Sequence, residues 1–298
     1  MINSLIWRIK EAFAVLTGNK KTQANLKRPA FPERSINNLP SYQTDNDEQL
    51  HKYISSKKIE FIFIEIGENR VNAGGNVDLQ NQNRLNPSYA TLKHYFPSAK
   101  FTVYSDFDLQ VEGVELKKIP QEKFDLFEEH PRKLYRLVQY MKLYAITHSD
   151  ADIAIAIDTD MFVFSENIYR LIYLTDKFGF CLPSSNALSM NFDVEHSLDT
   201  YPITDESGGL GSTFNITPMT FKTSDERGRA FYNKCMETTV KKGSRSSISM
   251  WNAIWESGLY PYMLPREFCV CRGSEGIGNE VILHVGHKSV AEYYNIKI

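Results

Sequence analysis

Short runs rich in β-branched and aromatic residues recur along the chain from residue 59 onward. Residues 59–66, 100–105 and 153–157 are such runs, and each is followed by a glycine or an aspartate. Runs this short and this apolar are typical of strands that a sheet buries on both faces. The pattern predicts three strands of one buried sheet.

Helical spacing of apolar positions lies between these runs. Residues 88–95 and 133–147 show this spacing, so strands and helices alternate. The alternation predicts an α/β fold with a Rossmann-like, mainly parallel sheet that is flanked by helices. Ligands of such sheets bind beyond the carboxyl ends of the strands. Asp158 follows the strand predicted at 153–157 and therefore lies where a ligand is expected.

The first 57 residues have a different pattern. Residues 1–18 mix apolar with charged side chains, and they are too short and too charged to span a bilayer or to form a standard signal peptide. They predict an amphipathic helix, whose role stays open between peripheral membrane attachment and docking on the body or on another subunit of a homo-oligomer. Residues 19–47 are polar and contain prolines, as linkers do. We therefore expect a helix and linker over residues 1–57 and one catalytic-sized domain over residues 58–298.

Positive and negative charges nearly cancel in this chain. Lys and Arg together number 34 and Asp and Glu 36, which gives a formal net charge of −2. A field this weak does not indicate a nucleic-acid partner. Any charged ligand must therefore be held by a local cluster of side chains.

The four cysteines show no pair with the two-residue gap of a zinc ribbon or a redox motif. Cys269 and Cys271 flank a single Val270, so on a strand both thiols would lie on one face. Such a pair would suit a metal or redox site, but we favour reduced thiols that form no disulfide. This interpretation predicts a reducing compartment, and we expect the protein in the cytoplasm, with the inner face of a membrane as the place where residues 1–18 would attach.

Asp158, Thr159 and Asp160 form an acidic triplet directly after the predicted strand at 153–157. In an extended segment both carboxylates would face the same side, where they could hold Mg²⁺ or Mn²⁺ together with diphosphate oxygens. Acidic pairs also cap turns and helices, so the triplet is a weak signal by itself. Its place between two apolar runs strengthens the signal, because two adjacent carboxylates in such surroundings need a compensating cation.

A second candidate cluster follows an apolar run at 281–283 and reads His284-Val285-Gly286-His287-Lys288. A neutral imidazole is a good ligand for Mn²⁺, Gly286 would let the backbone approach a phosphate, and a lysine would neutralise a diphosphate. A histidine that is merely satisfied within the core is the alternative for His284.

The segment from Lys142 to Asp160 resembles the one that leads to the metal motif in glycogenin-like members of glycosyltransferase family 8. In that family a lysine lies sixteen residues before the first metal aspartate, and Lys142 has this spacing from Asp158. The run that begins at His284 is similar to the family's terminal His-x-x-Gly-x-x-Lys-Pro-Trp signature. The resemblance implies a GT-A fold, a metal bound by Asp158, Asp160 and His284, and contacts from Lys142 to the nucleotide-sugar.

The resemblance is incomplete in the terminal signature. Gly286 follows His284 after one residue instead of two, and Ser289 and Val290 replace Pro-Trp. Lys288 and His287 therefore both remain candidates for the contact to the diphosphate.

The glycine-rich segment at 206–215 resembles the family's Phe-Asn-Ser-Gly segment in two alternative alignments. One alignment uses Ser207 and Gly208, and the other uses Phe214 and Asn215. The first would make Gly208 part of the donor site, whereas a flexible loop with turn glycines is the alternative.

The residues expected near the reacting carbon differ from those of family 8. Members of that family have an Asp-Gln pair about four residues before an asparagine on a helix. The counterpart here, residues 247–252, keeps the asparagine as Asn252 but has neither the Asp nor the Gln. The resemblance implies retention of the anomeric configuration more strongly than inversion. An inverting reaction would need a base, and Asp205, Glu206 and Glu256 are the candidates.

The resemblance implies transfer of a hexose from UDP-galactose or UDP-glucose to a hydroxyl of a glycan or glycolipid, as in polysaccharide biosynthesis. Asp158, Asp160 and Lys142 would be catalytic, with Mn²⁺ or Mg²⁺ stabilising the departing diphosphate. A metal-dependent nucleotidyltransferase or phosphohydrolase and a non-catalytic glycan-binding relative are the alternatives. The residues expected to contact the donor or its metal are Lys142, Asp158, Thr159, Asp160, Gly208, Gly286 and Lys288.

Overall fold

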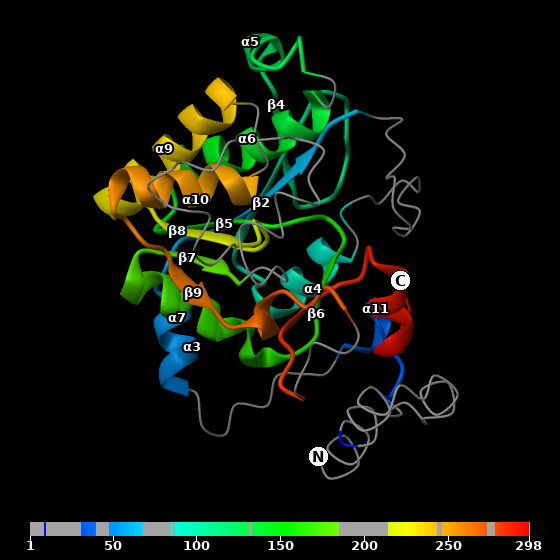
Figure 1. The fold of residues 1–298 in the computed structure, drawn as a ribbon. Helices are drawn as coiled ribbons and strands as arrows, with labels where there is room; N and C mark the ends of the chain where they lie inside the picture. The colour runs from blue at the N-terminus through cyan, green and yellow to red at the C-terminus, as the bar shows by residue number, and fades with distance from the viewer. Residues whose placement is uncertain are drawn as a thin grey trace.

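A computed structural model describes most of the predicted domain and parts of the segment before it (Figure 1). The predicted helix at 1–18, apart from Ile9, and Gly208 lie outside the described residues. The described residues are 9, 31–39, 48–67, 85, 87–130, 133–184, 214–242, 246–272 and 278–297.

A seven-stranded sheet forms the centre of the molecule. Its first four strands are parallel, β8 runs antiparallel to both of its neighbours, and the last strand is parallel to β7. This mainly parallel sheet confirms the predicted α/β fold class. In order across the sheet the strands are β4 (Glu115–Lys118), β3 (Lys100–Ser105), β2 (Ile59–Glu65), β5 (Ile153–Ala156), β8 (Met219–Lys222), β7 (Phe180–Pro183) and β9 (Tyr262–Leu264).

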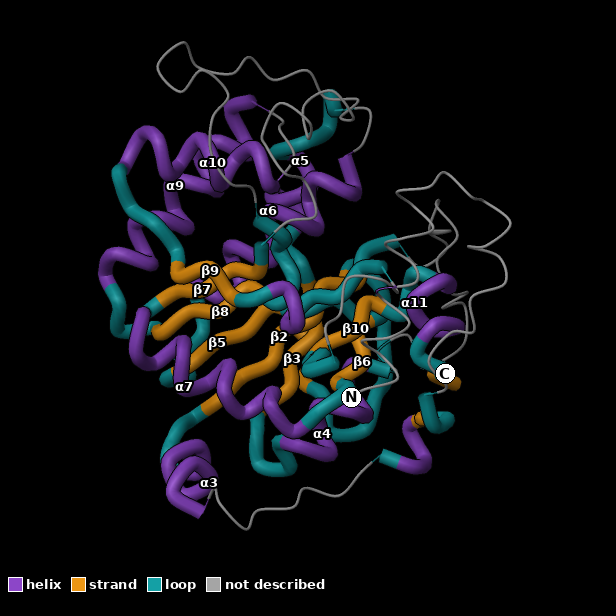
Figure 2. Tube along the Cα trace, turned by 60° about the horizontal axis from the view of Figure 1, so that its bottom comes forward, coloured by secondary structure: helices purple, strands orange, loops and turns teal. Residues whose placement is uncertain are grey.

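Helices cover both faces of this sheet (Figure 2). The helices are α3 (Glu48–Ser55), α4 (Ser88–Tyr95), α5 (Gln121–Asp125), α6 (Lys133–Thr147), α7 (Tyr169–Phe178), α9 (Glu226–Lys242), α10 (Ser246–Ser257) and α11 (Lys288–Tyr293). Short 3-10 helices lie at Ile36–Asn38, Glu166–Ile168 and Arg266–Phe268.

The side-chain alternation of β2 explains why the sheet has two apolar faces. All seven of its residues are buried. Phe61 and Phe63 pack with residues of α4 and α7 on one face, whereas Ile62 and Ile64 pack with residues of α6, α9 and α10 on the other. The predicted helices at 88–95 and 133–147 have the expected bounds, and the predicted strands at 59–66 and 153–157 each end one residue early.

The strand order places a candidate ligand site at one edge. Counted along the chain, the first four strands of the sheet are arranged 3-2-1-4, so the chain reverses its winding direction between β2 and β5. Ligands of doubly wound sheets bind beyond the carboxyl ends of the strands at this position. Asp158 follows the carboxyl end of β5.

Two small sheets lie beside the central one. β6 (Met161–Val163) pairs antiparallel with β10 (Ile282–His284), and His284 is opposite Met161 in this register. β1 (Arg34–Ser35) pairs in parallel with β11 (Ile296–Lys297). The β6–β10 pairing brings the C-terminal segment against the acidic triplet.

Parts of the predicted linker pack on the domain. The ring of Phe31 lies 5.0 Å from that of Tyr294, and the guanidinium of Arg34 lies 3.8 Å from the ring centre of Phe164. α3 packs against α7. A boundary between residues 57 and 58 stays a prediction.

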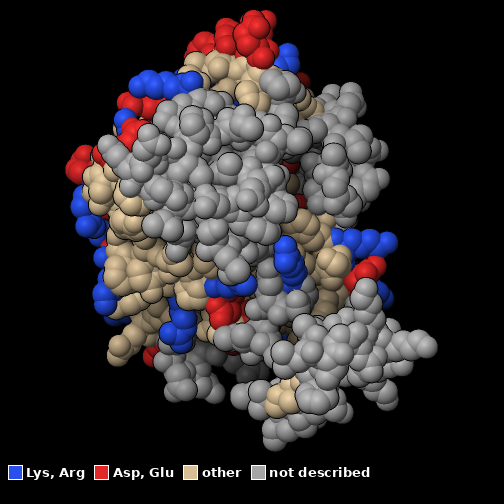
Figure 3. All heavy atoms as spheres, viewed as in Figure 1, with Lys and Arg blue, Asp and Glu red and all other residues tan. Residues whose placement is uncertain are grey.

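Charged side chains are distributed over the face shown in Figure 3, with acidic residues gathered over α5. Glu122, Asp125, Glu128 and Glu129 are the exposed acids of this region. On this face the described Lys and Arg side chains are scattered and form no single basic patch. Within the described residues no helix is long and apolar enough to cross a membrane.

Candidate active site

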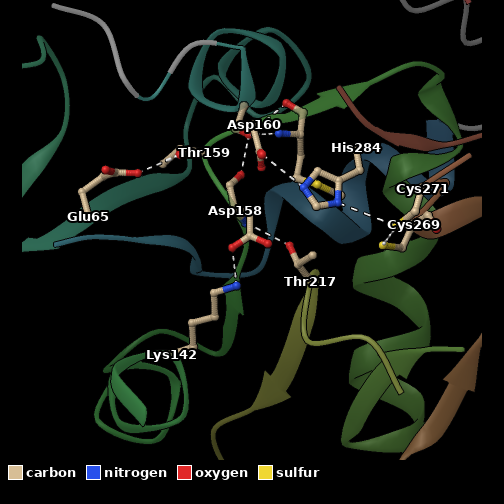
Figure 4. A network of polar contacts seen from close by, with 11 residues as sticks. Glu65, Lys142, Asp158, Thr159, Asp160, Thr217, Cys269, Cys271 and His284 are labelled. Atoms are coloured by element: carbon tan, nitrogen blue, oxygen red, sulfur yellow. Dashed lines mark hydrogen bonds and ion pairs between the residues drawn. The ribbon is translucent and has the colours of Figure 1, made fainter. Parts of the chain in front are cut away.

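Lys142 on α6 is a buried cation that faces the acidic triplet (Figure 4). Its side chain is 2% exposed, and its Nζ forms an ion pair and hydrogen bond with Oδ1 of Asp158, whose side chain is 29% exposed. A buried ammonium needs a compensating charge. Asp158 supplies that charge and in turn keeps the lysine directed at the end of β5.

The backbone around Asp158 is held by two hydroxyl groups that the sequence analysis did not identify. The amide of Asp158 donates to Oγ1 of Thr217 at 2.9 Å. Oγ of the fully buried Ser88 lies 2.6 Å from the carbonyl oxygen of Asp158 and accepts a hydrogen bond from the amide of Met161 at 2.8 Å. Neither residue belongs to a motif, and only the three-dimensional fold brings them to this loop.

Asp160 meets His284 across the β6–β10 pair. Oδ2 of Asp160 lies 3.1 Å from Nε2 of His284, and the carbonyl oxygen of Asp160 accepts a hydrogen bond from the amide of Gly286 at 3.2 Å. A Cβ on Gly286 would lie 1.8 Å from Oδ2 of Asp160. The absence of a side chain at Gly286 is therefore what lets the carboxylate occupy this position.

Asp158, Asp160 and His284 are arranged as a set of metal ligands. One ligand atom from each residue lies within 4.8 Å of the others. Two carboxylates and one imidazole suit Mn²⁺ or Mg²⁺, and the burial of Asp160 favours a compensating cation. The residues therefore fit the predicted metal.

The expectation that the triplet is extended is wrong. Thr159 and Asp160 form a turn, and the carboxylates converge because the chain bends there between β5 and β6. The hydroxyl of Thr159 donates to Oε1 of the buried Glu65 at 2.8 Å, on the side away from His284 (Figure 4). Its side chain thus anchors the turn to the end of β2.

The protonation states of Asp160 and His284 depend on each other. Burial raises the pKa of Asp160, but the charge and hydrogen bond of His284 outweigh it and lower that pKa below its ordinary value. Burial lowers the pKa of His284, but Asp160 and Cys271 outweigh it and raise that pKa well above 6.5. Without a cation the pair is therefore a carboxylate and an imidazolium.

We expect the affinity for Mn²⁺ to rise with pH. A cation on Nε2 must displace the proton of His284, and the raised pKa extends this competition well above the ordinary value of 6.5. Displacement of one proton corresponds to about a tenfold gain in affinity per pH unit below the pKa of His284. Isothermal titration calorimetry at several pH values measures this slope. His284→Gln should bind more weakly and with a flatter slope, whereas an equal slope in both proteins would contradict the assignment of His284.

A matched pair of substitutions tests the ion pair of Lys142 and Asp158. Asp158→Asn is expected to lower the free energy of unfolding by about 2 kcal/mol, less than the typical loss for a fully buried pair because Asp158 is partly exposed. Lys142→Met in the same chain should recover most of this loss, because no buried ammonium is then left uncompensated. Urea unfolding with a chelator present measures both values. A double variant as unstable as Asp158→Asn would show that the pair is not coupled.

Cys271 contacts the other nitrogen of His284. Its Sγ lies 3.7 Å from Nδ1 of His284 and 3.7 Å from Sγ of Cys269. The hydrogen bond from Cys269, helped by His284, lowers the pKa of the Cys271 thiol to about 4. The four cysteines, all within the described residues, form no disulfide. The thiols of Cys269 and Cys271 lie close together, although Val270 between them forms only an isolated β-bridge and the segment is not a strand.

The remaining predicted residues lie farther from this centre or outside the described part of the chain. Lys288 begins α11 with its side chain 76% exposed, and its Nζ lies 3.8 Å from Glu292. Glu256, a candidate base, forms an ion pair with Lys234 at 2.8 Å. Gly208, Asp205 and Glu206 lie outside the described residues. The structure thus brings Lys142, Asp158, Asp160 and His284 together, and the roles of all predicted site residues stay predictions.

No protein-family model matches the chain, and no curated protein matches it in sequence. Among solved structures, it is similar to the galactosyltransferase LgtC in complex with donor and acceptor sugar analogs, at 10% identity over 76% of this chain and 86% of that one, with a TM-score of 0.49. It is similar to 4-diphosphocytidyl-2C-methyl-D-erythritol synthase from Anaerococcus prevotii at 11% identity, over 82% and 97% of the two chains, with a TM-score of 0.42. It is also similar to the bifunctional IspDF from Campylobacter jejuni, at 14% identity over 75% of this chain and 51% of that one, with a TM-score of 0.40. Structural similarity this low carries no information on function. The function has to be inferred from the chemistry of the site itself.

Proposed function

We propose that this protein is a metal-dependent glycosyltransferase of the GT-A type that uses a nucleoside diphosphate sugar. The observation that carries the proposal is the convergence of Asp158, Asp160, His284 and Lys142 beyond the carboxyl end of β5. Two carboxylates and an imidazole suit a divalent cation, and a buried ammonium beside them suits an anionic substrate. A nucleoside diphosphate sugar meets both requirements.

Asp158, Asp160 and Nε2 of His284 would hold the cation, Mn²⁺ or Mg²⁺. A divalent cation bound there supplies a Lewis acid that stabilises charge on the departing diphosphate. Lys142 provides a second positive charge. Burial of its side chain and the contact with Asp158 hold its ammonium group in place. Because this charge is in place before the reaction, it needs no reorganisation as the leaving group develops negative charge.

The donor and acceptor are proposed from the resemblance to family 8. UDP-galactose or UDP-glucose would be the donor, a hydroxyl of a glycan or glycolipid the acceptor, and retention the stereochemical outcome. Thr159, Gly208, Gly286 and Lys288 belong to the proposed donor site. A cytoplasmic place of action at the inner face of a membrane, reached through residues 1–18, belongs to the same proposal.

A donor-hydrolysis panel tests this function. The full chain is incubated with UDP-galactose, UDP-glucose and other nucleotide sugars, with Mn²⁺ or with a chelator, and the products are separated by chromatography. We expect release of UDP that requires the cation, together with a thermal shift by UDP that also requires it. Pyrophosphate formed from a nucleoside triphosphate would indicate a nucleotidyltransferase instead. No UDP release and no cation-dependent thermal shift by UDP would contradict the proposal.

A further inference from the structure

A second group of metal-ligating side chains lies behind His284, on the side away from Asp160 (Figure 4). It contains Cys271, His287 and Nδ1 of His284, and the thiol of Cys269 lies next to that of Cys271. The ligand atoms of Cys271, His284 and His287 lie within 4.8 Å of one another. The transfer chemistry proposed above uses neither thiol, so this group calls for a separate explanation.

Backbone pairing fixes the positions of these side chains. Val270 forms a parallel bridge with Leu283. The amide of Val270 donates to the carbonyl oxygen of Ile282 at 3.0 Å, and the carbonyl oxygen of Val270 accepts a hydrogen bond from the amide of His284 at 2.9 Å. Cys271, which follows Val270, therefore lies beside His284, and Cys269 lies beside Cys271. The amide of His287 donates to the carbonyl oxygen of His284 at 3.1 Å, and the turn brings the second imidazole to the same place.

Two distances in this group match those that one tetrahedral ion would impose. With Zn–S bonds of about 2.3 Å and Zn–N bonds of about 2.0 Å, two sulfurs on one zinc lie about 3.8 Å apart and a sulfur and a nitrogen about 3.6 Å apart. The two thiols are 3.7 Å apart, and Cys271 Sγ is 3.7 Å from Nδ1 of His284. The ring centres of His284 and His287 are 4.5 Å apart, close enough for both imidazoles to serve one ion.

We propose that Cys271, His284 and His287, with the neighbouring thiol of Cys269, bind Zn²⁺ at a site that is separate from the carboxylate site. Thiolates and imidazoles together favour zinc over Mn²⁺ or Mg²⁺, which prefer oxygen ligands. Oδ2 of Asp160 lies 3.1 Å from Nε2 of His284, so it accepts the proton on the ring nitrogen that does not bind zinc. Carboxylates commonly orient zinc-bound histidines in this way.

Because they share His284, the two metal sites compete. A neutral imidazole has one nitrogen with a free lone pair and one that carries a proton. Zinc takes the lone pair on Nδ1 and leaves a proton on Nε2, whereas a cation between Asp158 and Asp160 requires the reverse. Zn²⁺ at the thiol site therefore weakens binding of Mn²⁺ at the carboxylate site, and the protein would respond to zinc.

Titration of the reduced full chain with Co²⁺ tests this site without any sugar donor. Cobalt at the thiol site gives a thiolate-to-metal charge-transfer band, whereas cobalt at the carboxylate site has no sulfur ligand and gives none. We expect the band in the wild type and its displacement by Zn²⁺. Cys271→Ser should remove the band and lower the affinity for Zn²⁺ on the order of a hundredfold or more. Cys269→Ser should weaken the band, and circular dichroism verifies that both variants are folded.

Two control variants separate this site from the transferase site. Cys235→Ala removes a thiol that is fully buried on α9, and Asp158→Asn removes a ligand of the carboxylate site. Both should keep the band. In Mn²⁺ binding measured by electron paramagnetic resonance, Zn²⁺ should weaken binding to the wild type but not to Cys271→Ser.

Absence of a charge-transfer band in the folded wild type would overturn the zinc site, as would an equal band in Cys271→Ser. Neither result bears on the proposed transfer reaction, because no nucleotide sugar is present. Conversely, a wild type that binds cobalt through thiolates but releases no UDP from any donor would leave the zinc site standing.

Discussion

Asp160→Asn is expected to lower the catalytic efficiency of cation-dependent UDP release by about a thousandfold or more. The substitution keeps the shape of the side chain and the hydrogen bond from the amide of Gly286 to the carbonyl oxygen of residue 160. It removes one negative charge from the proposed metal ligands and the charged partner of His284. Steady-state kinetics and Mn²⁺ titration on the same preparation measure both effects.

Asp108→Asn is the matched control for that substitution. Its side chain is 88% exposed and pairs with Lys118 at 2.6 Å, so the same chemical change occurs at the surface. This variant should retain the activity and the Mn²⁺ affinity of the wild type. An Asp160→Asn variant that binds Mn²⁺ and releases UDP as the wild type does would remove Asp160 from the site.

Gly286→Ala is expected to lower activity by about a hundredfold, because a shift of a site residue by about 1 Å can have an effect of this size. The new Cβ would lie 1.8 Å from Oδ2 and 2.6 Å from Cγ of Asp160. No real contact is this short, so the carboxylate must move away from His284. Kinetics with a series of Mn²⁺ concentrations should show a weaker apparent affinity for the cation.

A double-mutant cycle separates this effect from general destabilisation. In a protein that already carries Asp160→Ala, the change Gly286→Ala has no carboxylate to displace and should reduce activity little further. Ser289→Ala, at an exposed position of α11, should have no effect on activity. Independent, multiplicative losses from Gly286→Ala and Asp160→Ala would contradict the proposed contact.

The central sheet was predictable because its strands carry strong local signals. The residues of β2, β3 and β5 are almost all buried, and a glycine or an aspartate follows within two residues of each strand's end. β8 and β9 were not predicted. Their lengths of four and three residues are too short for a clear period, and the antiparallel direction of β8 depends on the long connection before it.

The pairing of β1 with β11 was equally inaccessible from the sequence. Arg34 and Ser35 belong to a polar, proline-containing stretch that reads as a linker. Their strand exists only because residues at the far end of the chain supply its partner. Local composition carries no information on such a contact.

Those site residues were predictable whose position in the sequence, relative to a strand or to each other, indicates their chemical role. Lys142 and Asp158 are sixteen positions apart, and the α6–β5 connection brings them into contact. His284 was identified by its place after an apolar strand. Ser88 and Thr217 were missed because hydroxyl residues outside motifs give no sequence signal, and their hydrogen bonds to the loop at Asp158 arise from elements distant in the chain.

A crystal structure of the full chain with UDP and Mn²⁺ tests the central claim most directly. Anomalous scattering at the manganese edge locates the ion independently of the protein model. We predict one manganese peak bonded to carboxylate oxygens of Asp158 and Asp160, to Nε2 of His284 and to the diphosphate of UDP, with Lys142 beside that cluster. UDP bound elsewhere, or bound without manganese between these three residues, would contradict the assignment of this site to transfer from a nucleotide sugar.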